Sequence, residues 1–337
     1  MPAELQIIRP SVHGSPEPEA HAVLQRLQLL RLSVTDLCNL RCRYCMPRAG
    51  VPRLAHNEIL SFEHLVRLVE WLAAGTGLTR IRLTGGEPLA RPGIEALIRQ
   101  LKSIERIREI SLTTNATLLA PRAEALKLAG LSRVNISLDS VDPERFAQVT
   151  RGGNLQRALD GIRAARHAGL TPIKINAVLR RSTWQKDVPQ LLDFAAAHGF
   201  EIRFIELMRT GTEREWCESE FVAAGEVCRG LGVPLTLCSG PAKGSARRTM
   251  LEWRGRLHPV GWITPRSHPF CASCDRLRLD TRGLLRRCLM DPQTFDLCRT
   301  LAEESELSAR RRFAAYIAAK RPPSFMDTSC SMSQIGG

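Results

Sequence analysis

The sequence predicts an α/β fold in which a partial (β/α)6 barrel, similar to a TIM barrel, is followed by a smaller α+β domain. Two observations support this. Short β-rich runs alternate with amphipathic helical stretches over the first two thirds of the chain, which is typical of a parallel sheet with right-handed crossovers. The alternation occurs six times, whereas a closed barrel needs eight such units.

Each predicted element follows from its local pattern. Residues 61–75 illustrate the helices: Ser61 is a suitable N-cap, and apolar residues such as Leu65, Val69 and Leu72 fall on one face. The strands are recognised by their content of β-branched residues and by their alternation. The six predicted strands cover residues 29–35, 79–85, 108–115, 132–139, 172–179 and 200–207.

Most of the predicted strands alternate apolar and polar residues, although parallel strands buried on both faces are usually apolar throughout. The sixth, which has Arg203 and Ile205 on one face, follows the alternation poorly. Ile81 and Leu83 point one way, while Arg80, Arg82 and Thr84 point the other. If the apolar faces pack on helices, the polar faces line the interior. An unpaired charge there would be costly, so we expect a wet, basic cavity that holds an anionic ligand. An antiparallel sheet with one solvated face would alternate similarly, but the intervening helices fit it poorly. The inward positions include Arg31, Ser111, Thr113, Arg133, Asn135, Ser137, Asp139, Lys174 and Asn176.

We divide the chain into four segments: a loose N-terminal extension (1–26), the barrel (27–232), a C-terminal domain (233–320) and an unstructured tail (321–337). In the third segment, the run "RTMLEWRGRLHPVGWIT" predicts a hairpin that turns near Arg254 and Gly255. Helices are expected around residues 294–303 and 304–319.

Composition narrows the choice of ligand and compartment. The net charge is +14, and 42 of the 48 basic residues are arginine, which suits phosphorylated ligands or nucleic acid but also fits a base-composition bias. Aromatic residues make up only 5%, so stacking of single-stranded nucleic acid is not expected. There is no membrane-length apolar run and no signal peptide, which predicts a cytoplasmic protein. Its eleven cysteines should then bind metal rather than form disulfides.

Cys38, Cys42 and Cys45 directly follow the first predicted strand, with the spacing C-x3-C-x2-C. This places them at the C-terminal mouth of the barrel, where such folds keep their active sites. Three clustered thiolates suit zinc or an iron–sulfur cluster. A [4Fe–4S] cluster held by three cysteines leaves one iron open to a small molecule. Zinc would need a fourth ligand, and the nearest candidate is His56.

A second triplet consists of Cys271, Cys274 and Cys288, with the spacing C-x2-C-x13-C. Zinc is a stronger alternative here, since His268 could complete a Cys3His site. Arg276 and Arg278 lie just beyond Cys274, two residues apart on one side of a predicted strand. Two arginines beside an open iron would favour an anionic ligand.

The first triplet, with Tyr44 before its last cysteine, resembles the radical S-adenosylmethionine (SAM) superfamily. In that superfamily the amino and carboxylate groups of SAM chelate the open iron. The segment "TGGEP" (Thr84–Pro88) resembles its glycine-rich motif. Gly85 and Gly86 would let the backbone approach SAM, and Glu87 would lie near the SAM ammonium.

The order and spacing of all the motifs, from about Leu30 to Gly337, resemble the GTP 3′,8-cyclase (MoaA) family. The motifs are "LRLSVTD", "IRLTGGEPL", "NISLD", "RFIELM", "CDRLRL" and a terminal Gly-Gly. The resemblance implies a lyase that converts GTP to (8S)-3′,8-cyclo-7,8-dihydroguanosine 5′-triphosphate, the first step of molybdenum cofactor biosynthesis. A 5′-deoxyadenosyl radical would abstract the ribose 3′ hydrogen, and the cofactors would be SAM and two [4Fe–4S] clusters.

The resemblance also implies a role for individual residues. Cys38, Cys42 and Cys45 would hold the first cluster, and Cys271, Cys274 and Cys288 the second, whose open iron would bind guanine. Catalytic roles fall on Arg31, Arg276 and Arg278. The SAM site would comprise Tyr44, Gly86, Glu87, Ser137 and Met208. The GTP site would comprise Arg31, Arg82, Thr113, Lys174, Arg276, Leu277 and Arg278, with Arg80 and Arg203 as additional contacts. Arg31, Arg82, Thr113 and Lys174 are also among the polar strand positions identified above from alternation alone.

Other implications concern partners and departures from the family pattern. A one-electron reductant such as a flavodoxin or ferredoxin is expected, as is a homodimer. The terminal Gly336 and Gly337 would reach into the active site. Leu37 replaces a usual arginine and Ala116 a usual glycine, which indicates a divergent member.

Two other functions are consistent with parts of the sequence. A two-cluster radical SAM enzyme that modifies a peptide would need further clustered cysteines; Cys298 is available, but Cys217, Cys228 and Cys238 are scattered. A zinc-bearing nucleic-acid-binding protein would explain the charge and both triplets. It would not explain the "TGGEP" segment or the polar-lined barrel.

Overall fold

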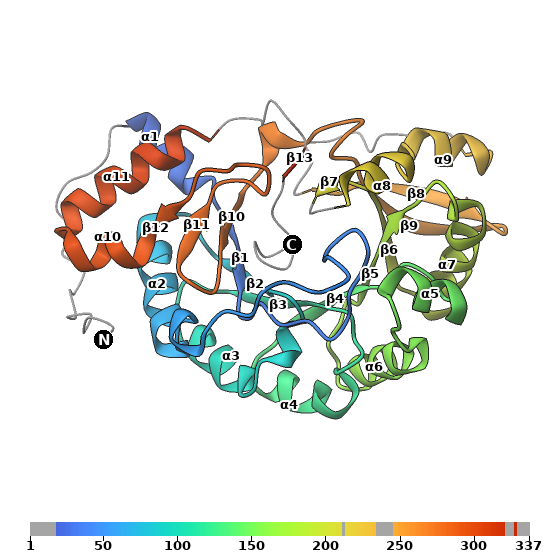
Figure 1. The fold of residues 1–337 in the computed structure, drawn as a ribbon, viewed down its shortest axis with the longest axis horizontal. Helices are drawn as coiled ribbons and strands as arrows, with labels where there is room; N and C mark the ends of the chain where they lie inside the picture. Colours follow the sequence, from blue (N-terminus) through green and yellow to red (C-terminus); the bar gives the residue numbers. More distant parts are fainter. Residues whose placement is uncertain (1–17, 211–212, 234–244, 321–326, 329–337) are drawn as a thin grey trace.

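The computed structural model of the protein describes residues 18–210, 213–233, 245–320 and 327–328. Six parallel strands lie side by side in chain order and form the curved sheet in Figure 1. The predicted strands are confirmed within two residues at each end. They are β1 (Leu29–Ser33), β2 (Arg80–Thr84), β3 (Glu109–Thr114), β4 (Arg133–Ser137), β5 (Lys174–Leu179) and β6 (Glu201–Glu206).

Helices cover the outer side of this curved sheet (Figure 1). The predicted helix after β1 begins at the expected cap, where the Ser61 side chain accepts a hydrogen bond from the His64 backbone N–H. Its residues Leu65, Leu68 and Leu72 are buried. The covering helices are α2 (Phe62–Gly75), α3 (Ile94–Lys102), α4 (Ala123–Leu128), α5 (Pro143–Thr150), α6 (Leu155–His167) and α7 (Trp184–His198).

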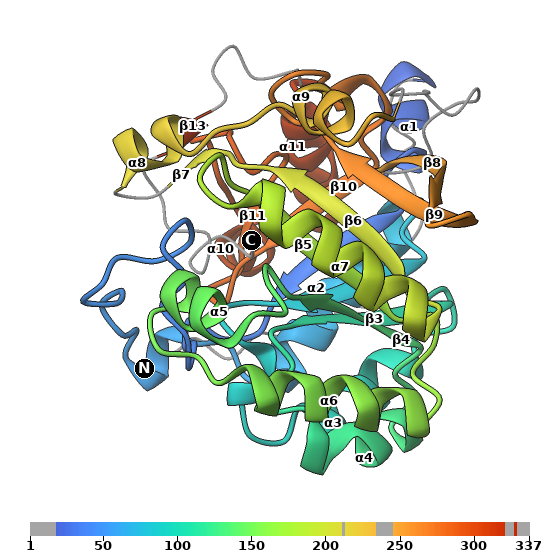
Figure 2. The ribbon, with the colours of Figure 1, turned by 90° about the vertical axis from the view of Figure 1, so that its right-hand side faces the viewer.

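The C-terminal segment extends both edges of the same sheet. β8 (Arg247–Trp253) and β9 (Arg256–Ile263) add a hairpin beside β6, as Figure 2 also shows. The predicted turn is confirmed: Arg254 and Gly255 have φ of 49° and 73°, the left-handed pair of a type I′ hairpin. Beyond β1 lie β10 (Arg276–Leu279), β11 (Leu284–Arg286) and β12 (Phe295–Asp296). The end strands β12 and β8 are not paired with each other, so the barrel is partial. The division into a barrel (27–232) and a separate C-terminal domain (233–320) stays a prediction.

Two segments predicted to be irregular contain regular structure. Within the supposed loose extension, α1 (Pro18–Gln25) packs on α11 (Glu306–Ala318), and its Leu24 is 5% exposed. A helix of eight residues that buries one leucine shows little periodicity, which explains the error. In the predicted unstructured tail, β13 (Asp327–Thr328) pairs with β7 (Arg209–Thr210). Gly336 and Gly337 lie outside the described residues.

The remaining elements connect these parts. The two predicted C-terminal helices are confirmed as α10 (Leu297–Glu303) and α11. Two short helices follow β7, and single 3₁₀ turns occur in four loops. They are α8 (Arg214–Ser219), α9 (Ala224–Gly230), η1 (His56–Glu58), η2 (Pro88–Ala90), η3 (Ala120–Arg122) and η4 (Cys271–Ser273). None of the helices in the described ranges has the length and apolar content needed to cross a membrane.

The two faces of the strands differ as the alternation predicted. Leu30, Leu32, Ile81 and Leu83 are fully buried in the single large hydrophobic core beneath the helices. The polar residues lie on the opposite face. Strand register aligns Arg31 with Arg82 and with Arg278, so the polar rows continue from strand to strand across the interior.

Candidate active site

The first cysteine triplet lies on the loop that follows β1, at the carboxyl end of the parallel strands. Burial raises the pKa of the Cys42 thiol, and the nearby thiols of Cys45 and Cys38 raise it further. The Leu40 backbone N–H donates to the Cys38 sulfur at 3.4 Å. The loop therefore brings the three thiols close together, and one of the sulfurs already accepts a hydrogen bond from the backbone.

The "TGGEP" segment packs directly against the start of this loop. The backbone N–H of Gly86 donates to the Thr35 carbonyl at 2.8 Å, and that of Glu87 donates to the Leu37 carbonyl at 2.7 Å. A Cβ atom added at Gly86 would lie 2.2 Å from the Leu37 carbonyl oxygen. Glycine is therefore required here by the close approach of two backbone segments, one residue before Cys38.

Glu87 joins the ends of two strands. Its carboxylate accepts hydrogen bonds from the Thr114 hydroxyl at 2.7 Å and the Asn115 backbone N–H at 2.8 Å, and also from the Leu89 N–H at 3.1 Å. Burial raises the pKa of Glu87 to about 7, against the opposing effect of these hydrogen bonds. Both carboxylate oxygens bind protein donors, so Glu87 fixes the loop beside the first triplet.

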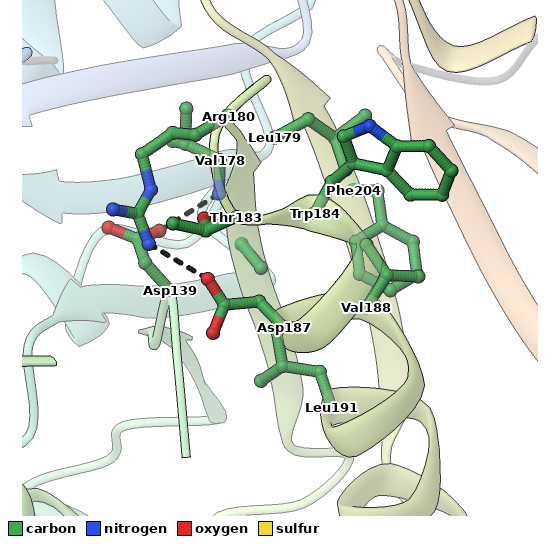
Figure 3. A pocket seen from close by; sticks show the side chains of 11 residues that line it. Asp139, Val178, Leu179, Arg180, Thr183, Trp184, Asp187, Val188, Leu191 and Phe204 are labelled. Carbon is green, nitrogen blue, oxygen red and sulfur yellow. Dashed lines mark hydrogen bonds and ion pairs between the residues drawn. The ribbon is translucent and has the colours of Figure 1, made fainter. Parts of the chain in front are cut away.

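Tyr44 is held by an acid that sequence reasoning placed on a polar face but did not assign. The Tyr44 hydroxyl donates to Asp139 Oδ2 at 2.7 Å, and Asp139 Oδ1 accepts from the Val178 N–H at 2.8 Å. Figure 3 shows Asp139 at a small pocket near the buried Arg180–Asp187 ion pair, whose atoms are 3.0 Å apart. The end of β4 thus anchors the aromatic residue between Cys42 and Cys45.

The other two residues predicted for SAM binding lie at strand ends. Ser137 is the last residue of β4 and pairs in register with Asn176 of β5. Met208 follows β6 and packs, with Cys288, against Leu289 and Met290. Ser137 therefore lies near the mouth, whereas Met208 lies beside the segment that carries a cysteine of the second triplet.

A row of arginines crosses three neighbouring strands in the interior. Register aligns Arg278 of β10, Arg31 of β1 and Arg82 of β2, and neighbouring strands are about 4.8 Å apart. Burial lowers the pKa of Arg31 well below its usual value, and the charges of Arg278, Arg82 and Arg276 lower it further. Burial is likewise the main reason why the pKa of Arg82 falls to about 9 and that of Arg278 to about 10. The mutual repulsion of these buried charges would be relieved by an anion.

Polar atoms near this row lack hydrogen-bond partners within the described structure. Arg82 Nε and Thr113 Oγ1 are both buried and unpartnered. Thr84 Oγ1 and Asn176 Oδ1 are in the same state. Leaving a buried polar group unsatisfied costs about 1–3 kcal/mol. Arg82 Nε and the two threonine hydroxyls can donate to acceptor oxygens of a ligand, whereas Asn176 Oδ1 would accept from a ligand donor.

Other interior cations have carboxylate partners that the sequence did not reveal. Glu201 lies 3.3 Å from Lys174 Nζ and 2.7 Å from Arg203 Nε. Burial lowers the pKa of Lys174 to about 8, aided by the charge of Arg203 and opposed by that of Glu201. Glu109 pairs with Arg133 at 2.7 Å, and Asp275 pairs with Arg80 at 2.6 Å. These acids lie at or next to the starts of strands, and only the register brings them beside the cations.

The second triplet lies at the other end of the strands. Cys274 precedes β10, which runs parallel to β1, while Cys288 follows β11, which runs antiparallel to β10. The first triplet follows the carboxyl end of β1, so the arginine row lies between the two triplets. Leu277, a predicted GTP contact, has its side chain in the hydrophobic core between the inward-pointing Arg276 and Arg278.

The charges around the second triplet favour a thiolate. Burial would raise the pKa of the Cys274 thiol, but the charges of Arg276 and Lys320 and hydrogen bonds from Arg276 bring it below its ordinary value. The pKa of Cys271 is raised by burial and by the thiols of Cys288 and Cys274. The three sulfurs therefore lie near one another.

Both donor sets fit iron–sulfur clusters. Among the described residues, no group of three His, Cys, Asp or Glu side chains is arranged to hold a single metal ion. In a cubane cluster each cysteine thiolate binds one iron, so three cysteines leave one iron without a protein ligand. Three thiols at each end of the interior therefore suit a [4Fe–4S] cluster that keeps one iron open.

Comparisons with known proteins agree with this geometry. Residues 32–195 match the radical SAM superfamily, and residues 200–326 match a family described as Molybdenum Cofactor Synthesis C. The chain is 44% identical over 282 residues to the GTP 3′,8-cyclase of Pelotomaculum thermopropionicum, covering 83% of this chain and 86% of that relative. It is 42% identical to the GTP 3′,8-cyclase of Moorella thermoacetica, covering 93% of this chain and 98% of the relative.

The chain belongs to the GTP 3′,8-cyclase family. Membership confirms the predicted enzyme class, a radical SAM enzyme of molybdenum cofactor biosynthesis, and implies SAM and [4Fe–4S] clusters as cofactors. The roles predicted for individual side chains stay predictions.

Solved structures share the fold. Streptococcus suis SuiB bound to its precursor peptide SuiA superposes with a TM-score of 0.59 at 15% identity, covering 93% of this chain and 77% of SuiB. SuiB bound to S-adenosylmethionine gives a TM-score of 0.57 at 14% identity, covering 90% and 77%. At this identity the likeness shows the fold, and it does not favour the peptide-modifying alternative. Cys217 and Cys228, two of the cysteines that are scattered in the sequence, are both buried.

The two departures from the family pattern lie beside the first triplet. Leu37 is 39% exposed and lines a pocket together with Cys38 and Arg41. Ala116 is buried and adopts φ of 62°, a left-handed conformation that costs a residue with a Cβ about 1–2 kcal/mol. The backbone at Ala116 thus keeps the conformation that glycine would adopt without strain.

Proposed function

We propose that this protein catalyses the conversion of GTP to (8S)-3′,8-cyclo-7,8-dihydroguanosine 5′-triphosphate. The observation that carries the proposal is the buried row of Arg278, Arg31 and Arg82 between two cysteine triplets. A triphosphate carries several negative charges and acceptor oxygens that guanidinium groups bind, and the interior extends from this row toward a triplet at either end.

Different side chains would bind different parts of the substrate. Arg31, Arg82 and Arg278 would bind the triphosphate, since guanidinium groups bind phosphate oxygens in pairs. Thr113 Oγ1, which has no partner within the described residues, would donate a hydrogen bond to the substrate. Lys174 would approach from β5, where it lies 3.3 Å from Glu201. Arg276, two residues before Arg278 on the same side of β10, would lie next to the second cluster.

Cys38, Cys42 and Cys45 would hold the first cluster, and SAM bound there would supply the radical chemistry that acts on the ribose. The protein supplies position and charge. Tyr44 and Asp139 fix the first cysteine loop from β4, while Gly86 and Glu87 fix it from β2. Holding the ribose near the SAM site limits side reactions of the radical. Cys271, Cys274 and Cys288 would hold the second cluster, whose open iron would bind the guanine.

We also propose three properties that follow from this function. A one-electron donor such as a flavodoxin or ferredoxin would reduce the first cluster, the working form would be a homodimer, and the protein would act in the cytoplasm. The terminal Gly336 and Gly337 would enter the interior beside the substrate.

An anaerobic assay tests the proposal. The protein is loaded with iron and sulfide, reduced, and given SAM with GTP, with ATP or without nucleotide. We expect 5′-deoxyadenosine to form with GTP, in step with conversion of GTP to the cyclic product. Equal formation without GTP would contradict the substrate, and no formation by a fully loaded enzyme would contradict the catalytic role altogether.

The arginines beside the second triplet give a second test. We expect Arg276→Ala and Arg278→Ala to abolish cyclisation while leaving the iron content unchanged. Loss of iron in these variants would instead assign the two arginines a structural role.

A further inference from the structure

Lys320 lies against the second cysteine loop although it is 32 residues beyond Cys288 in the chain. It follows the end of α11 and is half-buried. Its ammonium donates hydrogen bonds to the Arg276 carbonyl at 2.6 Å and to the Cys274 carbonyl at 3.4 Å. A lysine from the last helix thus spans the segment that joins a cysteine of the second triplet to the strand with Arg276 and Arg278.

We propose that Lys320 is a positioning residue for the second [4Fe–4S] cluster: it fixes the Cys274–Arg276 backbone and places a positive charge beside the cluster thiolates. The inference rests on the second cluster of the proposed function.

The hydrogen bonds explain the positioning. An ammonium has three donors, and Lys320 directs at least two of them to carbonyls two residues apart. These contacts hold the backbone between Cys274 and Arg276 and so fix the orientation of both residues. The first residue is a proposed cluster ligand, and the second begins β10.

The charges explain why a cation is found here. The ammonium of Lys320 interacts with the thiols of Cys274 and Cys288, which are the groups that become thiolates when a cluster binds. The charge of Arg276 repels it. Bound thiolates would therefore give this ammonium its counterions. A nearby positive charge also favours reduction of a cluster, because reduction adds negative charge.

Residues that follow α1 also hydrogen-bond to the same loop. Arg26, just after α1, donates to the Ala272 carbonyl at 2.8 Å, and the backbone N–H groups of Gln28 and Leu29 both donate to the Asp275 carbonyl, at 2.9 and 3.1 Å. α1 and α11 lie side by side (Figure 1). Residues that follow α1 and the residue Lys320 after α11 thus both hold this loop, and Lys320 contributes the contact nearest to a cysteine.

The test compares three variants of Lys320 with a matched control. Lys127 Nζ donates to the Gly169 carbonyl at 2.7 Å, the same kind of contact but remote from the triplets in the chain. Lys320→Met removes both the hydrogen bonds and the charge, Lys320→Gln keeps a donor without the charge, and Lys320→Arg keeps the charge. Lys127→Met is the control.

The readouts are iron and acid-labile sulfide per chain, and the midpoint potential of the second cluster. The potential is measured in full-length chains whose first triplet is replaced by alanine. We expect Lys320→Met to fall from about eight irons per chain toward about four, as two four-iron clusters imply. Lys320→Gln should keep more iron than Lys320→Met and shift the potential to a more negative value. Lys320→Arg and Lys127→Met should resemble the wild type in both readouts.

Full iron content and an unchanged potential in both Lys320→Met and Lys320→Gln would overturn the inference. Equal iron loss in Lys127→Met would also overturn it, since the loss would then reflect general instability. If the wild type itself binds only about four irons, the second cluster of the proposed function fails, and this outcome is distinct from a failure of Lys320 alone.

Discussion

Arg82 lies in the buried row between Arg31 on β1 and Ser111 on β3. Its Nε has no hydrogen-bond partner in the described structure, so its charge is poorly compensated in the free protein. Replacing Arg82 with Met keeps most of the side-chain volume and removes the charge. We expect this change to stabilise the free protein and to weaken GTP binding.

The structure sets the size of both effects. Burial lowers the pKa of Arg82 from 12.5 to about 9. At about 1.4 kcal/mol per pKa unit, holding the charge there costs at most about 5 kcal/mol. Because the interior is polar and screens charge, we take about 2 kcal/mol. Relief of this cost should raise Tm by about 4 °C. Loss of a charged hydrogen bond to phosphate costs about 1.5–3 kcal/mol, or about 10- to 100-fold in GTP affinity.

Arg133 provides the matched control. It points into the same interior but pairs with Glu109 at 2.7 Å, so Arg133→Met would leave a partly buried carboxylate unpaired. We expect Tm to fall in Arg133→Met and to rise in Arg82→Met. The assay is thermal unfolding of the cluster-loaded protein under anaerobic conditions, with GTP affinity measured by equilibrium dialysis. A lower Tm and unchanged GTP affinity in Arg82→Met would refute the reasoning.

Further predictions concern pH, the glycine-rich segment and the C-terminus. Because burial lowers the pKa of Lys174 from 10.5 to about 8, the unfolded chain binds more protons than the folded chain between these pH values. Tm of the free protein should therefore rise with pH in this window. Lys174→Met should reduce the slope, and saturating GTP should flatten it; a slope unaffected by either would exclude Lys174 as its source. Gly86→Ala places a Cβ 2.2 Å from the Leu37 carbonyl oxygen and should lower first-cluster iron and SAM binding. Gly225→Ala, where a Cβ meets no atom within 4 Å, should change neither, and a normal iron content in Gly86→Ala would contradict the packing argument. Deleting Gly336 and Gly337 should lower turnover without changing the iron content, and unchanged turnover would reject a role for the terminus.

Features that depend on local patterns were predictable from the sequence. The β-rich runs located all six barrel strands, and alternation marked the inward face of the first five, because those strands bury one face beneath helices. The positive φ values expected of a tight hairpin fell on Arg254 and Gly255 as predicted. The interior positions of Arg31, Arg82, Thr113 and Lys174 followed from strand alternation alone. Cysteine spacing indicated both triplets, since ligands of one cluster lie close together in the chain.

Features that depend on distant pairing were not predictable. β10 pairs with β1 across more than 240 residues, and only this pairing brings Arg278 beside Arg31. Glu201 and Glu109 give no local signal, because each lies at the start of an ordinary strand. Lys320 could not be connected to Cys274 without knowing where α11 packs. A short helix such as α1 was missed because one buried leucine makes no periodic pattern.

The interior carboxylates reduce the free-energy cost of burying several cations in one interior. Glu201 partners Lys174 and Arg203 on β5 and β6, and Glu109 partners Arg133 on β4, so that side of the interior is largely neutralised. Arg278, Arg31 and Arg82 instead align with one another in register, and Ser111 follows Arg82 in the same row. Because like charges about 5 Å apart repel each other strongly where water is scarce, an anion bound along this row would relieve that repulsion. We therefore expect the triphosphate to bind on the β10–β1–β2 side of the interior and the neutral parts of the ligand to lie on the β4–β6 side.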